Sequence, residues 1–116
     1  MNILVNITSD KKDLVKAGNA VKGFKDVIGE KIIMTGVIIY EKEELDEKTG
    51  EVKKNIVSCV KMENGEFITS ISPTVTNSLQ LIANTYDADE IKAGVEVMVM
   101  SKKSNSNRDF LYLDLV

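Results

Sequence analysis

Apolar and polar positions alternate along much of the chain, which is typical of strands with one buried face. Residues 2–8 predict a first strand, with apolar side chains on one face at Ile3, Val5 and Ile7. A helix is predicted next, capped by Ser9 or Asp10, with apolar residues at helical spacing at Leu14, Ala17 and Val21. Gly18 and Gly23 interrupt this helix and weaken it.

A long β-hairpin is predicted after this helix. Residues 31–43 form a proline-free run rich in β-branched side chains, residues 46–50 supply a turn, and residues 52–62 form the partner strand. Asn64-Gly65 is the strongest short hairpin signal, because a type I′ turn needs positive φ at both central residues. A short third strand is predicted over residues 66–71.

A second helix opens at Ser72-Pro73, where the hydroxyl can cap free amides and proline occupies the first helical position. It ends near Asp87, and its apolar stripe consists of Val75, Leu79, Ile82 and Tyr86. Two more strands are predicted around a polar turn at 104–107: residues 95–103, with Ile91 before them, and residues 110–116.

The order of elements from residue 31 onward is strand, strand, strand, helix, strand, strand. That is the order of the OB-fold, a five-stranded Greek-key barrel with a helix between its third and fourth strands. The sequence therefore predicts a mainly β chain with one or two helices, in which residues 31–116 form the barrel and residues 1–30 an N-terminal strand-helix extension. No linker or repeat divides the chain, so one domain is expected over residues 1–116.

Composition excludes several classes of chemistry. The 116 residues include no histidine and one cysteine, which rules out zinc sites built from these residues and removes the usual base of a serine or cysteine nucleophile. Cys59 lies in an apolar run and is expected to be a buried, inert thiol. The glycines form neither a dinucleotide fingerprint nor a phosphate loop, and no cofactor or metal is expected.

Acidic residues gather in two places. Six lie between Glu41 and Glu51, where a polar hairpin tip explains them more simply than general acid/base catalysis, and Asp87-Ala88-Asp89-Glu90 is expected to be a solvated turn rather than a metal site. No stretch approaches the roughly 18 apolar residues of a membrane span, and residues 1–6 do not resemble a signal peptide. No membrane association and a cytoplasmic location are therefore expected.

Several short stretches share their turns and charges with a known family. They are residues 29–33, 48–51, 64–65, 70–75, 101–103 and 108–111. Over residues 25–116 the chain resembles small single-stranded DNA-binding proteins of phages and mobile elements of low-GC Gram-positive bacteria. The resemblance implies sequence-tolerant binding of single-stranded DNA, or of RNA, during replication or recombination in the host cytoplasm, with aromatic rings stacking on bases and cations following the phosphates.

Strand parity independently predicts a surface suited to that task. The last two strands each have one aliphatic face, which we assign to the core: Val95, Val97 and Val99, and Leu111, Leu113 and Leu115. If the strands pair as a hairpin with those faces inward, the opposite surface combines methionines, rings and cations: Met98, Met100, Lys102, Arg108, Phe110 and Tyr112. Single-strand binding requires this combination of flat rings and positive charge.

Further cations extend the predicted nucleic-acid site. They are Lys53, Lys54 and Lys61 on the second long strand and Lys103 beside the last turn. Two alternatives stay open: the N-terminal strand and helix, or a second subunit in a homo-oligomer, could cover the Met/Phe/Tyr face. The sequence thus predicts a single-stranded DNA-binding protein that is not an enzyme, with a protein–protein interaction module (an inhibitor or assembly subunit) as the alternative.

Overall fold

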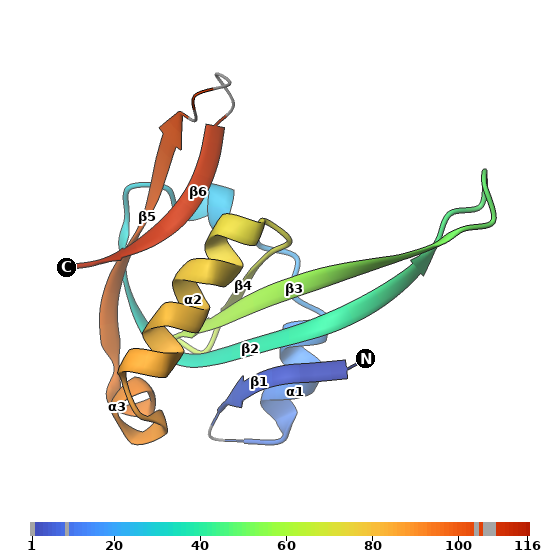
Figure 1. Ribbon diagram of the computed structural model, residues 1–116. Coiled ribbons are helices and arrows are strands. Elements are labelled where there is room, and N and C mark those ends of the chain that lie inside the picture. The colour runs from blue at the N-terminus through green and yellow to red at the C-terminus, as the bar shows by residue number, and fades with distance from the viewer. Residues whose placement is uncertain (1, 9, 104, 106–108) are drawn as a thin grey trace.

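A computed structural model describes residues 2–8, 10–103, 105 and 109–116. Six strands and three α-helices, with one short 3-10 helix, make up these residues (Figure 1). Their bounds in chain order are β1 Asn2–Ile7, α1 Lys12–Gly18, η1 Phe24–Val27, β2 Lys31–Leu45, β3 Val52–Met62, β4 Phe67–Ser70, α2 Pro73–Thr85, α3 Ala88–Ala93, β5 Val95–Lys103 and β6 Asp109–Leu115.

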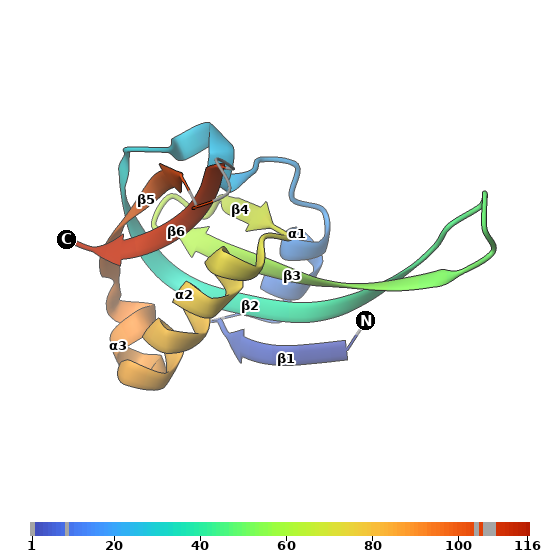
Figure 2. The ribbon, with the colours of Figure 1, turned by 45° about the horizontal axis from the view of Figure 1, so that its top comes forward.

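All strands join one antiparallel sheet in the order β4-β3-β2-β5-β6, with β1 added to β2. β2 pairs with β3 along nearly its whole length, while its other edge pairs first with β5, at residues 31–34, and then with β1, at residues 37–41. The distal halves of β2 and β3 project from the body as a long arm (Figures 1 and 2). This arrangement confirms a mainly β, barrel-like fold of the OB type with an N-terminal extension.

The barrel is not closed as the sequence analysis expected, because β4 and β6 each pair with something else. The N–H of Thr69 on β4 donates to the carbonyl of Lys22, at 3.0 Å, and Gly23 bridges the same residue. On β6, the N–H of Leu113 donates to the Ser78 hydroxyl of α2, at 3.3 Å. Each of the two strands that would meet in a closed barrel therefore makes a hydrogen bond to another segment instead.

Two elements cover the ends of the open barrel. α2 lies across one end, with Val75, Leu79 and Ile82 in the main core. η1 lies at the other end and inserts Phe24 and Val27 into the same core, between the bridges that Gly23 makes to Thr69 and Ile28 makes to Val99. The sequence analysis had no signal for η1, since two buried residues in four are too few for a period to be recognised.

A bulge in β2 decides which of its residues face the core. The register with β3 shifts between Met34 and Gly36, so the buried core residues are Ile32 and Met34 before the shift and Val37 and Ile39 after it. A Cβ at Gly36 would lie 2.9 Å from the carbonyl oxygen of Ile7. The glycine therefore allows β1 to approach β2 closely at this point.

The N-terminal extension covers the other face of β2, β3 and β4. Ala17 of α1 packs in a second cluster against residues of those three strands, namely Ile38, Tyr40, Val57, Cys59 and Phe67. The carboxylate of Asp13 on α1, 2 % exposed, accepts a hydrogen bond from Nζ of Lys61 on β3 at 3.0 Å. An apolar contact and an ion pair together hold α1 on the sheet.

Two helix predictions were wrong in extent. α1 ends at Gly18, and Val21, predicted to continue its apolar stripe, is 97 % exposed. The acidic segment predicted as a turn begins α3 instead: Asp87 and Glu90 form a reciprocal capping box, and Ile91 is fully buried behind it. Among the described residues, no helix has both the length and the apolar character needed to cross a membrane.

Burial of Cys59 is confirmed and leads to a testable property. The thiol is fully buried beneath α1, and this burial raises the pKa of Cys59 above its ordinary value, against a smaller lowering by the Thr69 hydroxyl. Less thiolate is then present at a given pH, and the thiolate is the reactive species. We expect a disulfide reagent at pH 8 to modify native protein far more slowly than protein unfolded in urea; equal rates would contradict the burial.

Candidate nucleic-acid interface

The β5–β6 hairpin has the two faces that the sequence predicts, except that Leu115, assigned to the core, is 46 % exposed near the end of β6. Its inner face places Val97, Val99 and Leu113 in the main core. On the opposite surface, Met100 lies across from Tyr112 and Lys102 from Phe110. We call this surface the outer face of β5–β6; it consists of Met98, Met100, Lys102, Phe110 and Tyr112, with the exposed Asp114 opposite Met98.

The two rings of the outer face lie close together. The centroids of Phe110 and Tyr112 are 6.1 Å apart and their planes are inclined by 41°. Both rings and both methionines are half-buried, and none of the four belongs to either core cluster or to the side chains packed against the main one. Met100 and Tyr112 are direct partners across the two strands, and the exposed Lys102 lies opposite Phe110.

The N-terminal extension does not cover the outer face, which decides one alternative left open by the sequence. β1 pairs with β2, and the apolar residues of α1 pack over β2, β3 and β4. In OB-folds the face of the second and third barrel strands commonly binds the ligand. Those strands are β3 and β4 here, and α1 packs on their outer surface, whereas the apolar residues of α1 do not pack on β5–β6. A second subunit on this face stays a prediction.

Lys31 joins the outer face, although the sequence analysis did not select it. It is the register partner of Met98 and is exposed. Parity alone could have indicated its direction, because Ile32 faces the core. Its neighbours on β5, however, follow from long-range pairing that the sequence does not show.

Two other predicted cations lie far along the β2–β3 arm and are paired with acids. Lys53 lies 3.9 Å from Asp46, and Lys54 lies 3.5 Å from Glu41, in each case between Nζ and a carboxylate oxygen. In both pairs the lysine is exposed and the acid half-buried, and surface pairs of this kind each stabilise a fold by less than about 1 kcal/mol. The arm therefore balances its lysines locally and is not brought together with the outer face.

The remaining predicted cations also separate from the outer face. Lys61 is held by Asp13 beneath α1. Lys103 has the opposite parity to Lys102, and its register partner is Asp109. Arg108 lies outside the described residues. Of the cations predicted from sequence, the structure thus places Lys102 beside the rings.

Comparison with protein-family models decides the family. The model described as Phage Single-stranded DNA-binding protein, of the Phi29 type, matches residues 7–116. The chain belongs to this family of phage single-stranded DNA-binding proteins. No curated protein and no solved structure matches it. The family resemblance inferred from short stretches is confirmed, and binding of single-stranded DNA is the function that follows.

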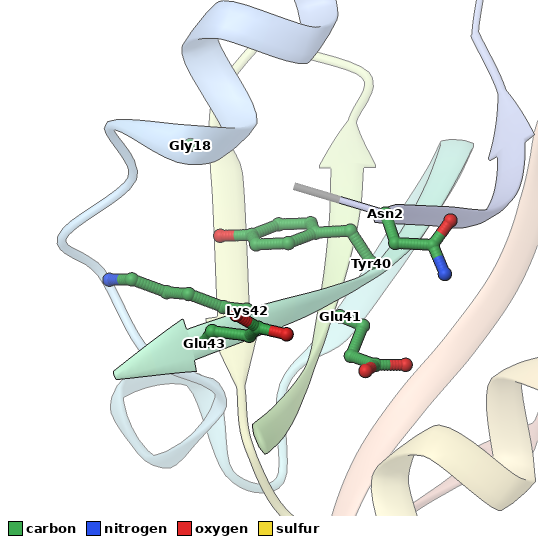
Figure 3. Close-up of a pocket in the computed structure, with 6 residues that line it drawn as sticks. All are labelled: Asn2, Gly18, Tyr40, Glu41, Lys42 and Glu43. Atoms are coloured by element: carbon green, nitrogen blue, oxygen red, sulfur yellow. The ribbon is translucent and has the colours of Figure 1, made fainter. Parts of the chain in front are cut away.

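A hollow beside β1 has different properties from the outer face. It encloses about 570 Å³ and is lined by residues of β1, α1 and β2 (Figure 3). The ring of Tyr40 lies under Gly18 and is 6 % exposed, and Glu41 and Glu43 outnumber the nearby Lys42. A buried ring cannot stack on a base, so Tyr40 gives this hollow no stacking surface for single-stranded DNA.

Proposed function

We propose that this phage protein holds single-stranded DNA on the outer face of β5–β6, with little dependence on base sequence, during replication or recombination in the host cytoplasm. It acts by binding rather than by catalysis. The observation that carries the proposal is the register that sets Met100 beside Tyr112 and Lys102 beside Phe110 on a surface that α1 leaves uncovered.

The chemistry of this face accounts for sequence tolerance. Every base has a flat face, and stacking on an aromatic ring contributes about 1–3 kcal/mol per base. The methionines are flexible and polarisable and adapt to different bases. Lys102 and Lys31 supply charge to the phosphates without reading base edges. α2 contains no lysine or arginine, so it is unsuited to the major groove of a duplex.

Fluorescence titration of labelled oligo(dT) at several salt concentrations tests the proposal. We expect saturable binding whose log K falls linearly with log salt. Removing two phosphate contacts in Lys31→Gln/Lys102→Gln should lower the magnitude of the slope by about 1.4, at roughly 0.7 per contact. The matched control is Lys53→Gln/Lys54→Gln, which removes the same charge from the arm and should leave the slope nearly unchanged.

Competition experiments separate the possible ligands. Mixed-sequence single strands should compete nearly as well as oligo(dT), and duplex DNA of the same length poorly, because its bases are already stacked. Oligo(U) measures whether RNA is accepted on the same face. Equal competition by duplex would contradict stacking, and the absence of saturable binding to any nucleic acid would favour a protein partner for this surface.

A further inference from the structure

A second concentration of positive charge lies outside the outer face, in the N-terminal extension. Residues 11–25 contain a third of the cations of a chain that has 15 lysines and arginines in all: Lys11, Lys12, Lys16, Lys22 and Lys25. All five side chains are exposed. The single acid of this segment, Asp13, is buried and already paired with Lys61. Apart from Lys22, which lies 3.9 Å from Glu66, the exposed lysines of this segment form no ion pair with any residue that the structure describes, so the segment carries excess positive charge in a protein of net charge −3.

Two adjoining hollows lie along this segment. The first, which we call the α1 hollow, encloses about 470 Å³ between α1 and the β3–β4 turn and is bordered by Lys16, Val21 and Lys22. The second, the seam hollow, encloses about 310 Å³ where the barrel stays open between β4 and β6. Lys22 lines the first and Gly23 the second, so neighbouring residues border the two hollows at the point where this segment pairs with Thr69 of β4.

The seam hollow reaches the β5–β6 hairpin. It is lined by Lys25 of η1, by the exposed Ile71 and by Leu111 of β6. Leu111 lies between Phe110 and Tyr112 in the chain, but its side chain is on the opposite, inner face of the hairpin. Lys103 is on that same inner face, nearer the turn. Figure 2 shows η1 beside the β5–β6 hairpin, with α1 beyond β4.

We propose that single-stranded DNA continues from the β5–β6 hairpin through the seam hollow into the α1 hollow. This inference rests on the proposed function and extends it. Lys25, Lys22 and Lys16 contact successive phosphates, and Ile71 and Val21, both exposed, meet the bases. The weak pair between Lys22 and Glu66, 3.9 Å apart and exposed on both sides, gives way to a phosphate at little cost.

Several observations favour DNA as the occupant of this path. The path begins at Leu111 on β6, so DNA leaving Phe110 and Tyr112 passes over the edge of β6 to reach it. Its lysines, Lys16, Lys22 and Lys25, outnumber Glu66, the one acid that lines the two hollows, and exposed apolar side chains lie among them. A positively charged groove with apolar contacts for bases is what sequence-tolerant single-strand binding uses. The N-terminal extension then supplies part of the DNA site in addition to covering β3 and β4.

The test compares oligo(dT) of about 5 and about 16 nucleotides, which span the range of site sizes of OB-folds. In the variant Lys16→Gln/Lys22→Gln/Lys25→Gln we expect affinity for the long oligonucleotide to fall roughly tenfold or more at low salt. The magnitude of its salt slope should fall by about 2, at about 0.7 per contact. Affinity for the short oligonucleotide, held by the outer face, should stay within about twofold of the unmodified protein.

The matched control is Lys42→Gln/Lys53→Gln/Lys54→Gln, which removes three exposed charges from the arm. An unchanged salt slope in the Lys16/Lys22/Lys25 variant would overturn the proposed path. So would an equal loss of affinity for the long oligonucleotide in the control. Phe110→Ala distinguishes failure of the proposed path from failure of the proposed function. This variant should weaken binding of the short oligonucleotide, whatever the result with the lysine variant. If the lysine variant loses affinity for oligo(dT) while Phe110→Ala has no effect, both the proposed binding at the outer face and the path that continues from it are wrong.

Discussion

Replacing Phe110 and Tyr112 together by alanine is expected to weaken the binding of single-stranded DNA by about 2–4 kcal/mol, with each ring contributing in the range of about 1–3 kcal/mol. The two rings lie 6.1 Å apart on the outer face of β5–β6 and belong to neither core cluster. Their removal takes away stacking surface while Val97, Val99 and Leu113 keep the hairpin on the core. Oligo(dT) titration measures the loss, and thermal unfolding checks that the fold persists.

A suitable control for these ring variants is Leu81→Ala. Leu81 is an apolar side chain on α2 that is 69 % exposed, so its truncation removes comparable exposed apolar surface away from the proposed interface. Affinity should be unchanged in this control. If Phe110→Ala and Tyr112→Ala instead lower the melting temperature strongly and leave affinity intact, the rings serve packing, and the outer face is not where DNA stacks.

The parts of the structure that were predictable from sequence are those set by local pattern. The alternation of Val97, Met98, Val99 and Met100 fixes which side chains share a face, whatever the strand pairs with. The turn after Lys103 then requires the next strand to return alongside. These two local facts were sufficient to place Met100, Lys102, Phe110 and Tyr112 on one face, and the structure adds the register that pairs Met100 with Tyr112 and Lys102 with Phe110.

The parts that were not predictable depend on partners distant in sequence. The sequence assigned no acidic partner to Lys53 or Lys54, but the register of the arm places Glu44 opposite Lys53 and Glu43 opposite Lys54. Lys61 meets Asp13, 48 residues away. A lysine's availability to DNA depends on such pairings, and neither spacing nor composition reports them.

The opening of the barrel between β4 and β6 also depends on partners distant in sequence. The order of the five strands predicts a closed barrel only if the two edge strands of the sheet, β4 and β6, are free to pair with each other. Here residues 22–23 reach β4 from outside the barrel, and the Ser78 hydroxyl of α2 occupies β6. The N-terminal extension thereby changes the barrel as well as the surface that a ligand can reach.

The pair of Asp13 and Lys61 gives the second large effect that we expect. Lys61→Met should lower the free energy of unfolding by about 3 kcal/mol, because it leaves the 2 %-exposed carboxylate of Asp13 without its ion-pair partner. Asp13→Ala should cost less, since the side chain of Lys61 keeps 21 % exposure and its ammonium can reach water. Urea unfolding of each variant measures the difference.

The double variant Asp13→Leu/Lys61→Met distinguishes a buried ion pair from a DNA contact. Replacing both charges by apolar side chains should recover most of the stability lost in Lys61→Met, because no unpaired charge stays buried. At the same time its affinity for oligo(dT) should equal that of the unmodified protein, since Lys61 lies under α1 and away from the outer face. A salt slope smaller in magnitude by about 0.7 in this stable double variant would instead make Lys61 a phosphate contact, as its position in the sequence first suggested.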